Sequence, residues 1–188
     1  MPYLHIIVLL LLPLLSFCQN KTYQTEQAAI AMLPEFCNFL QMPCDANNPA
    51  ELEDNIQWCE KQFSQRGFQI GRLPTEGIEV VLAEYFRSIK LPTVLFYVQI
   101  DGQPVDPSKW ASGEPYTAML GNPTEEGYTF LPELPTDFSS VDRELRLFSR
   151  AASDAKGPIA MFLAAWDHLR SKNEEPAFNI KVIMDTEE

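Results

Sequence analysis

Histidine and basic side chains are scarce in this sequence of 188 residues. It contains two histidines and 14 Lys and Arg against 26 Asp and Glu, which gives a formal net charge of −12. Binding to nucleic-acid phosphates needs clustered Lys and Arg, so this charge argues against a nucleic-acid partner. His5 lies close to the amino terminus, and His168 lies on the polar face of a predicted helix. A zinc site of the usual histidine-containing kind therefore cannot be completed from this chain alone.

Cysteine pairs with the spacing of a metal ribbon are also absent. The chain has four cysteines and no CxxC sequence, which excludes a structural zinc ribbon. Apart from Cys18, the remaining cysteines are Cys37, Cys44 and Cys59. Because three is an odd number, not all of them can pair within the chain, and their disulfide state stays open. Cys59 lies on the apolar face of a predicted helix and is expected to be a small buried side chain.

The apolar run over residues 6–15 is too short to span a bilayer and is interrupted by Pro13. It is followed by Ser16-Phe17-Cys18, which is typical of a signal peptidase site. The sequence therefore predicts a signal peptide over residues 1–18 and export to the periplasm or the extracellular space. Lipoprotein anchoring would acylate Cys18, but the bulky Phe17 before it disfavours this alternative.

Apolar periodicity in the rest of the chain predicts an α/β fold. Helices are expected over 24–40, 50–65 and 158–172. Strands are expected over 68–73, 78–86, 93–100, 145–149 and 178–184. The last two strands and the helix between them predict a βαβ unit with parallel strands. Residues 102–144 are rich in Pro, Gly and acidic residues and predict a long loop.

Acidic residues follow three of the predicted elements. Asp101 follows the strand 93–100, Asp154 follows the strand 145–149, and Glu187 and Glu188 follow the last strand. If these strands are parallel neighbours, the carboxylates converge at one edge of the sheet. Such a cluster needs a divalent cation or raised pKa values, because the charges repel one another.

Each of these acids also has a purely structural interpretation. Asp101 with Gly102 can simply form a turn, and Asp154 can cap the helix that follows it. Glu187 and Glu188 can be no more than an acidic chain end. The grouping of all three favours a metal site.

Three segments resemble the amino-terminal half of the dinuclear zinc peptidases, a family that includes aminoacylase, carnosinase-like cytosolic dipeptidase and succinyl-diaminopimelate desuccinylase. They are LPTVLFYVQIDGQPVDPSKW, RLFSRAASDAKGPIAMFLAAWDHL and PAFNIKVIMDTEE. The resemblance covers roughly residues 50–188 and implies a three-layer α/β sandwich with a mostly parallel mixed sheet, incomplete at its carboxyl end. We accordingly divide the chain into the signal peptide (1–18), an amino-terminal lead and helix (19–49) and the front part of a catalytic domain (50–188).

The resemblance also implies a role for each site residue. The family motif His-x-Asp corresponds to Gln99-Ile100-Asp101, so glutamine replaces a histidine ligand and Asp101 keeps the orienting position. The metal-bridging aspartate corresponds to Asp154, in Asp154-Ala155-Lys156-Gly157. Glu188 corresponds to the general base; in an alternative register Glu187 is the base and Glu188 a ligand.

Two Zn²⁺ ions, with Mn²⁺ or Co²⁺ as alternatives, are implied as cofactors, and the site with Gln99 is expected to be weaker. The implied reaction is hydrolysis of a peptide or N-acyl amide, with a small peptide or N-acyl amino acid as substrate. The family's lid, through which homodimers form, and its remaining ligands lie downstream of the matching segments. A fragment of a longer enzyme, inactive alone, is therefore expected.

Two alternatives remain open from the sequence. The first is a catalytically inactive peptide-binding homologue, because of Gln99 and the missing ligands. The second is an unrelated α/β fold whose acidic strand ends bind calcium or magnesium.

Overall fold

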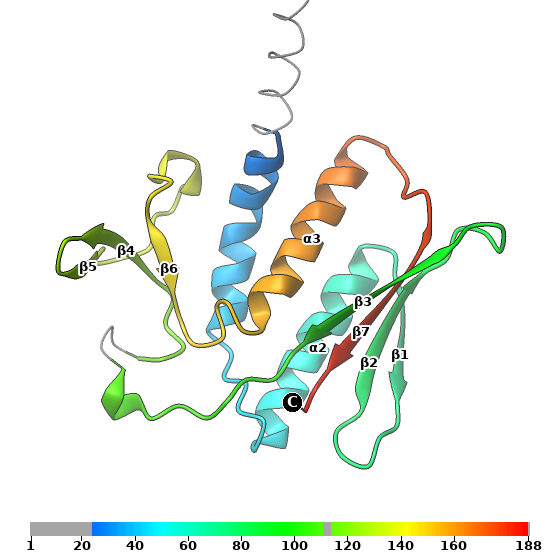
Figure 1. Ribbon diagram of the computed structural model, residues 1–188, viewed down its shortest axis with the longest axis horizontal. Coiled ribbons are helices and arrows are strands. Elements are labelled where there is room, and N and C mark those ends of the chain that lie inside the picture. Colours follow the sequence, from blue (N-terminus) through cyan, green and yellow to red (C-terminus); the bar gives the residue numbers. More distant parts are fainter. Residues whose placement is uncertain (1–23, 111–113, 188) are drawn as a thin grey trace, which may run out of the picture.

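The computed structural model describes residues 24–110 and 114–187 (Figure 1). The expected signal peptide, with Cys18, and the expected base Glu188 lie outside the described residues. Predictions that concern them stay predictions.

The described chain contains every helix and strand that the sequence predicts, with ends within two residues of the expected ones. A first helix covers residues 24–40. It is followed by α2 (Pro49–Gln65), β1 (Gln69–Leu73), β2 (Val80–Tyr85), β3 (Thr93–Gln99), the short 3₁₀ helix η1 (Pro107–Lys109), β4 (Met119–Thr124), β5 (Gly127–Phe130), the 3₁₀ helix η2 (Phe138–Ser140), β6 (Arg146–Phe148), α3 (Lys156–Ser171) and β7 (Asn179–Asp185).

Helix α2 begins and ends where its sequence favours it. Pro49 lies in the first turn, where a backbone N–H is not needed, and Glu51 lies near the positive end of the helix dipole. The buried residues form one stripe along the helix: Leu52, Asn55, Ile56, Cys59 and Phe63. Gly67 follows the helix with φ +88°, a conformation that glycine adopts without steric cost.

The main sheet has four strands in the order β1-β2-β7-β3. The pairs β1/β2 and β2/β7 are antiparallel, and β3 and β7 are parallel. The α/β class with a mixed sheet is thus confirmed. The expectation of a mostly parallel sheet is wrong for the described residues, since one of these three pairs is parallel.

A second sheet of three antiparallel strands has the order β5-β4-β6. The predicted parallel βαβ unit is therefore wrong, because β6 pairs with β4 and not with β7. Strands β4 and β5 lie inside the predicted long loop 102–144. The sequence does not predict β4, because this strand contains Gly121 and Pro123, two residues that are uncommon in strands.

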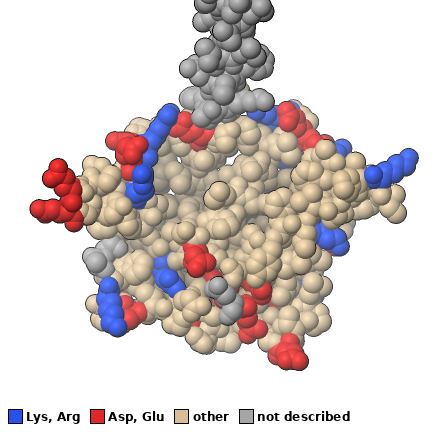
Figure 2. Space-filling model, in the orientation of Figure 1, with Lys and Arg blue, Asp and Glu red and all other residues tan. Residues whose placement is uncertain are grey.

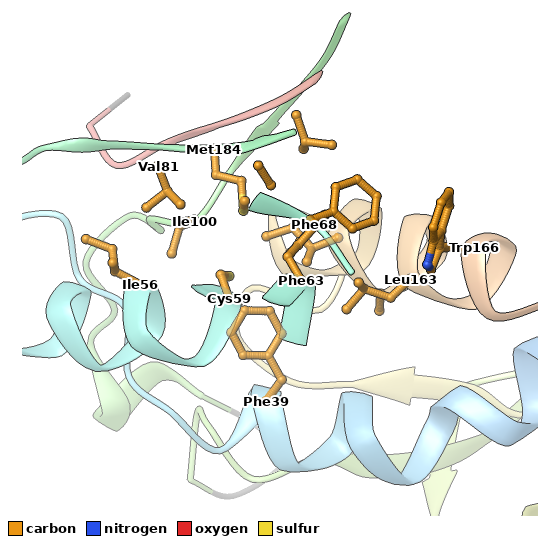
Figure 3. Packing of buried hydrophobic residues seen from close by; sticks show 14 of the residues in the cluster. Phe39, Ile56, Cys59, Phe63, Phe68, Val81, Ile100, Leu163, Trp166 and Met184 are labelled. Atoms are coloured by element: carbon orange, nitrogen blue, oxygen red, sulfur yellow. The ribbon is translucent and has the colours of Figure 1, made fainter. Parts of the chain in front are cut away.

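The core lies between the main sheet and the helices (Figure 3). Val81 of β2 and Met184 of β7 point from the sheet toward Cys59 and Phe63 of α2 and Leu163 of α3. The expectation for Cys59 is confirmed, since it is fully buried and unpaired. The first helix also belongs to this core.

The first helix joins the two sheets. Met32 and Phe39 pack in the main core. Cys37 and Leu40 of the same helix pack in a second cluster with Leu120 of β4. The segment before α2 is therefore an integral part of the folded unit.

The described helices cover one face of the main sheet. On the opposite face the side chains of Leu95 and Tyr97 are 58% and 59% exposed. On their other side the helices meet the second sheet, so main sheet, helices and second sheet follow one another (Figure 1). Figure 2 shows charged side chains mostly around the outline of one face, with no cluster of basic ones. In the ranges that the structure describes, no helix is both long and apolar enough to cross a membrane.

Candidate functional site

The two parallel strands β3 and β7 end side by side. Gln99, the last residue of β3, lies opposite Asp185, the last residue of β7. The backbone N–H of Ile100 donates to the Asp185 carbonyl at 2.8 Å and extends the pairing by one step. Residues that follow either strand, Asp101 and Glu187 among them, therefore leave the sheet at the same edge.

Asp101 is buried, with 3% of its surface exposed, and the glycine after it fixes its backbone. The Gly102 N–H donates to the Cys44 carbonyl at 2.7 Å, and the Gly102 carbonyl accepts from the Ala46 N–H at 3.0 Å. A Cβ at position 102 would lie 3.0 Å from Cys44 Sγ. Glycine therefore permits this close approach, and the segment around Cys44 holds the loop that carries Asp101.

The turn before α3 lies against the same loop. Arg150 donates from Nε and Nη2 to the Gln103 carbonyl at 3.0 and 2.6 Å. The Cβ of Ala151 would lie 3.9 Å from a Cβ at Gly102. The structure thus brings the segments of Asp101 and Asp154 together. Asp154 itself is exposed, and its peptide bond to Ala155 is cis.

Lys156 ties the turn before α3 to the end of the first helix. Its Nζ donates to the carbonyls of Phe39 and Met42 at 2.8 and 2.6 Å and lies 4.4 Å from the centre of the Phe39 ring. The side chain is fully buried, and burial lowers its pKa to about 8. Lys156 thus caps the end of the first helix and ties it to the start of α3.

Gly157 completes the anchor. A Cβ there would lie 2.5 Å from the Ala152 carbonyl oxygen, a backbone atom that cannot easily move. The Lys-Gly part of the quoted motif therefore shapes the turn that presents Asp154. The sequence assigned no role to Lys156. A usable signal was a lysine that opens an otherwise apolar helix.

Glu187 contacts the turn between β1 and β2. Its carboxylate accepts from the Ile78 N–H at 3.2 Å and packs against Gly77. The hydroxyl of the buried Thr186 donates to the Ile78 carbonyl at 3.1 Å. The segments that carry Asp101 and Asp154 thus lie against each other, while the Glu187 side chain lies against the β1–β2 turn.

The donors available for a metal ion are oxygens. Asp101 and Asp154 offer carboxylates and Gln99 offers an amide oxygen. Oxygen ligands suit hard divalent cations better than soft metal ions. Within the described residues, no group of three or more His, Cys, Asp or Glu could hold a metal. These residues therefore do not complete a metal site by themselves.

An apolar groove borders the Asp154 turn between the first helix and α3. It has a volume of about 490 Å³, and its lining includes Ala152, Ser153 and Gly157 from the turn and Met161 from α3. Asp101 and Gln99 do not line this groove.

Comparison with known proteins identifies the fold. No family model matches the chain, and a sequence search of curated proteins finds no match. Human carnosine dipeptidase 1 superposes with a TM-score of 0.65 at 20% identity, over 86% of this chain and 33% of its own. An M20 family metallo-carboxypeptidase from Sulfolobus solfataricus gives 0.61 at 25% identity, over 82% and 30% of the two chains. The dipeptidase Dug1p from Saccharomyces cerevisiae gives 0.60 at 18%, over 87% and 34%.

The chain has the fold of the M20 metallopeptidases. It spans about a third of the length of these three neighbours. The expected resemblance is confirmed at the level of the fold, and the alternative of an unrelated α/β fold is wrong.

Proposed function

We propose that this chain contributes to metal-dependent hydrolysis of a peptide or N-acyl amide bond. The observation that carries the proposal is the parallel pairing of β3 and β7, with the loop after β3 held against the turn before α3. Asp101 and Glu187 leave the main sheet at one edge, and the turn that carries Asp154 lies against the loop after β3, which supports a shared site. The substrate would be a small peptide or an N-acyl amino acid.

The proposed roles follow from position. Asp154 would be a metal ligand, and Asp101 would orient the group at position 99. Glu188 would take a proton from the attacking water and pass it to the leaving amine; in the alternative register Glu187 does this and Glu188 is a ligand. A bound divalent ion, Zn²⁺ or else Mn²⁺ or Co²⁺, would supply an acidic water at neutral pH.

The test is hydrolysis of a dipeptide and N-acetyl amino acid panel by the protein that carries this chain, with added Zn²⁺, Mn²⁺ or Co²⁺. We expect turnover that a chelator abolishes. Glu188→Gln should lower kcat by roughly 10²–10⁴-fold, the usual contribution of a general base. Turnover that persists in the chelator, or that is unchanged in Glu188→Gln and Glu187→Gln, contradicts the proposal.

The second candidate function is peptide binding without turnover, and Gln99 is the residue that favours it. An amide oxygen is a weaker zinc donor than imidazole. If the protein is an enzyme, Gln99→His should tighten metal binding measured by calorimetry and keep or raise kcat. A wild-type protein that binds dipeptides but stays inactive, and whose Gln99→His variant is inactive as well, would favour the binding role.

We also propose export of the protein, which rests on residues 1–18 alone. The expected mature amino terminus is Gln19. Edman or mass-spectrometric analysis of the processed protein checks this, and a lipid-modified Cys18 would instead support anchoring.

A further inference from the structure

A polar network surrounds the end of β7, immediately before the two glutamates. The hydroxyl of Tyr97 on β3 donates to Asp185 Oδ2 at 2.8 Å. The other carboxylate oxygen of Asp185, Oδ1, accepts from the backbone N–H groups of Thr186 and Glu187 at 2.8 and 3.4 Å. One aspartate therefore links the neighbouring strand to the backbone that leaves β7.

The opposite side of the same backbone is held by the β1–β2 turn. Thr186 is fully buried, and its hydroxyl donates to the Ile78 carbonyl at 3.1 Å. The N–H of Ile78 donates to the Glu187 carboxylate at 3.2 Å. Two successive residues after β7 thus bind the two backbone groups of a single residue that is about 110 positions earlier in the chain.

Gly77 makes room for this contact. A Cβ at position 77 would overlap the carboxylate of Glu187. The atoms that it would meet are the far end of a flexible side chain, so a substitution there would move Glu187 and leave the backbone in place.

We propose that Tyr97, Asp185 and Thr186 are positioning residues that fix the direction in which the chain leaves β7, and thereby the geometry of the Glu187–Glu188 pair. The proposal rests on the proposed function for its catalytic consequence. None of the three residues is assigned a proton transfer or a metal bond. Their effect is on placement, and a misplacement of about 1 Å at a reacting group can lower a rate by roughly 10²-fold.

The first test removes the network one group at a time and measures kcat and KM. Asp185→Ala should lower kcat by at least ~10-fold and leave KM within ~2-fold, because orientation is lost and substrate binding is kept. Asp185→Asn should retain most of kcat, since its amide oxygen can still accept from the two N–H groups. Tyr97→Phe should give a smaller loss. Tyr128→Phe, an exposed tyrosine of β5 outside the network, is the matched control and should behave as wild type.

The second test displaces Glu187 sterically. Gly77→Ala should lower kcat while the thermal midpoint stays close to that of wild type. Gly71→Ala is its control, because a Cβ there meets nothing within 4 Å.

A third measurement is independent of turnover. Amide hydrogen exchange at Thr186 and Glu187 should be faster in Asp185→Ala than in wild type and Asp185→Asn. Inactive wild-type protein would refute the proposed function, whereas the exchange data would still decide on the network. Unchanged exchange in Asp185→Ala would contradict the positioning role of these residues. The same holds if the enzyme is active and its Asp185→Ala and Gly77→Ala variants keep the wild-type kcat.

Discussion

At the scale of single residues, Lys156 is a basic side chain in a fully buried environment. Its ammonium group is fully buried, yet it is satisfied by two backbone carbonyls and the ring of Phe39. Removing it would take this donor from both carbonyls: the Phe39 carbonyl would keep the Met42 N–H at 3.2 Å, while the partly buried Met42 carbonyl would lose the Lys156 donor. An unsatisfied buried acceptor lowers the stability of the folded state, so replacing Lys156 should destabilise the fold.

We expect Lys156→Met to lower the free energy of unfolding by roughly 1–3 kcal/mol, since both carbonyls lose their bond to Nζ while the apolar volume is nearly kept. Chemical denaturation at pH 7 measures this. Lys181→Met is the control, because Lys181 pairs with Glu84 on an exposed strand face. Its cost should be at most ~1 kcal/mol, the usual value of a surface ion pair. Equal losses in the free energy of unfolding for both variants would contradict this structural role of Lys156.

The same residue predicts a pH dependence. Its folded pKa of about 8 lies below the ordinary value of 10.5, so between these limits the unfolded chain binds more protons than the folded chain. The free energy of unfolding that Lys156 contributes should therefore rise with pH in this window. The stability gap between wild type and Lys156→Met should widen from pH 8 to pH 10 in denaturation curves; a gap that narrows would refute the lowered pKa.

At the scale of elements, sequence patterns locate helices and strands well and their pairing less well. The apolar stripe of α2 and the β-branched run of β3 are local signals, and both elements lie where they are expected. The pairing of β6 with β4 is not local, and three residues of β6 carry too little pattern to choose a partner. The boundaries of helices and strands could be predicted from local residue patterns, whereas the pairing of strands into sheets could not.

The candidate site divides in the same way. The positions of Asp101 and Asp154 at element ends could be predicted, because each follows a recognisable strand. The contact of Glu187 with the β1–β2 turn could not, since it joins residues about 110 positions apart. The role of Lys156 also needed the folded chain, because its acceptors lie at the end of the first helix and just after it.

The turn that presents Asp154 gives an element-scale prediction. Gly157→Ala places a methyl group against the Ala152 carbonyl and should destabilise the fold by about 1–3 kcal/mol, as overpacking usually does. If the proposed function holds, it should also lower metal affinity, because the turn must shift. Gly71→Ala, with open space around its Cβ, is the control. Wild-type stability and metal affinity in Gly157→Ala would refute this account of the motif.

At the scale of the whole molecule, the uncovered face of the main sheet is the dominant surface feature. Leu95 and Tyr97 on this face, and Phe86 and Ile89 in the segment between β2 and β3, are large apolar residues with exposures between 58% and 90%. Strand β3 also forms an edge of the four-stranded sheet in the described part of the chain. Exposed apolar edges promote association.

We therefore expect the 188-residue chain expressed alone to self-associate at micromolar concentrations. The double variant Leu95→Lys/Ile89→Lys should shift it toward monomer in sedimentation velocity, because charge on the edge strand β3 and on the segment before it opposes association. Met161→Lys, a change of an exposed apolar residue on α3, is the matched control and should leave the association unchanged. A sharp monomer peak for the unmodified chain would contradict this prediction.

The hydrogen bonds of Lys156 have a practical consequence for the choice of shortened proteins. Its acceptors, the carbonyls of Phe39 and Met42, belong to the end of the first helix and the residue that follows shortly after it. A shortened protein that starts at Ala50, the first residue matched by the family resemblance, would keep Asp101 and Asp154 but lose both acceptors. It would also expose the surfaces that Met32 and Leu40 now cover. An expression boundary chosen from the sequence resemblance alone would thus remove the support of the turn that carries Asp154, and a shortened protein should keep the helix over residues 24–40.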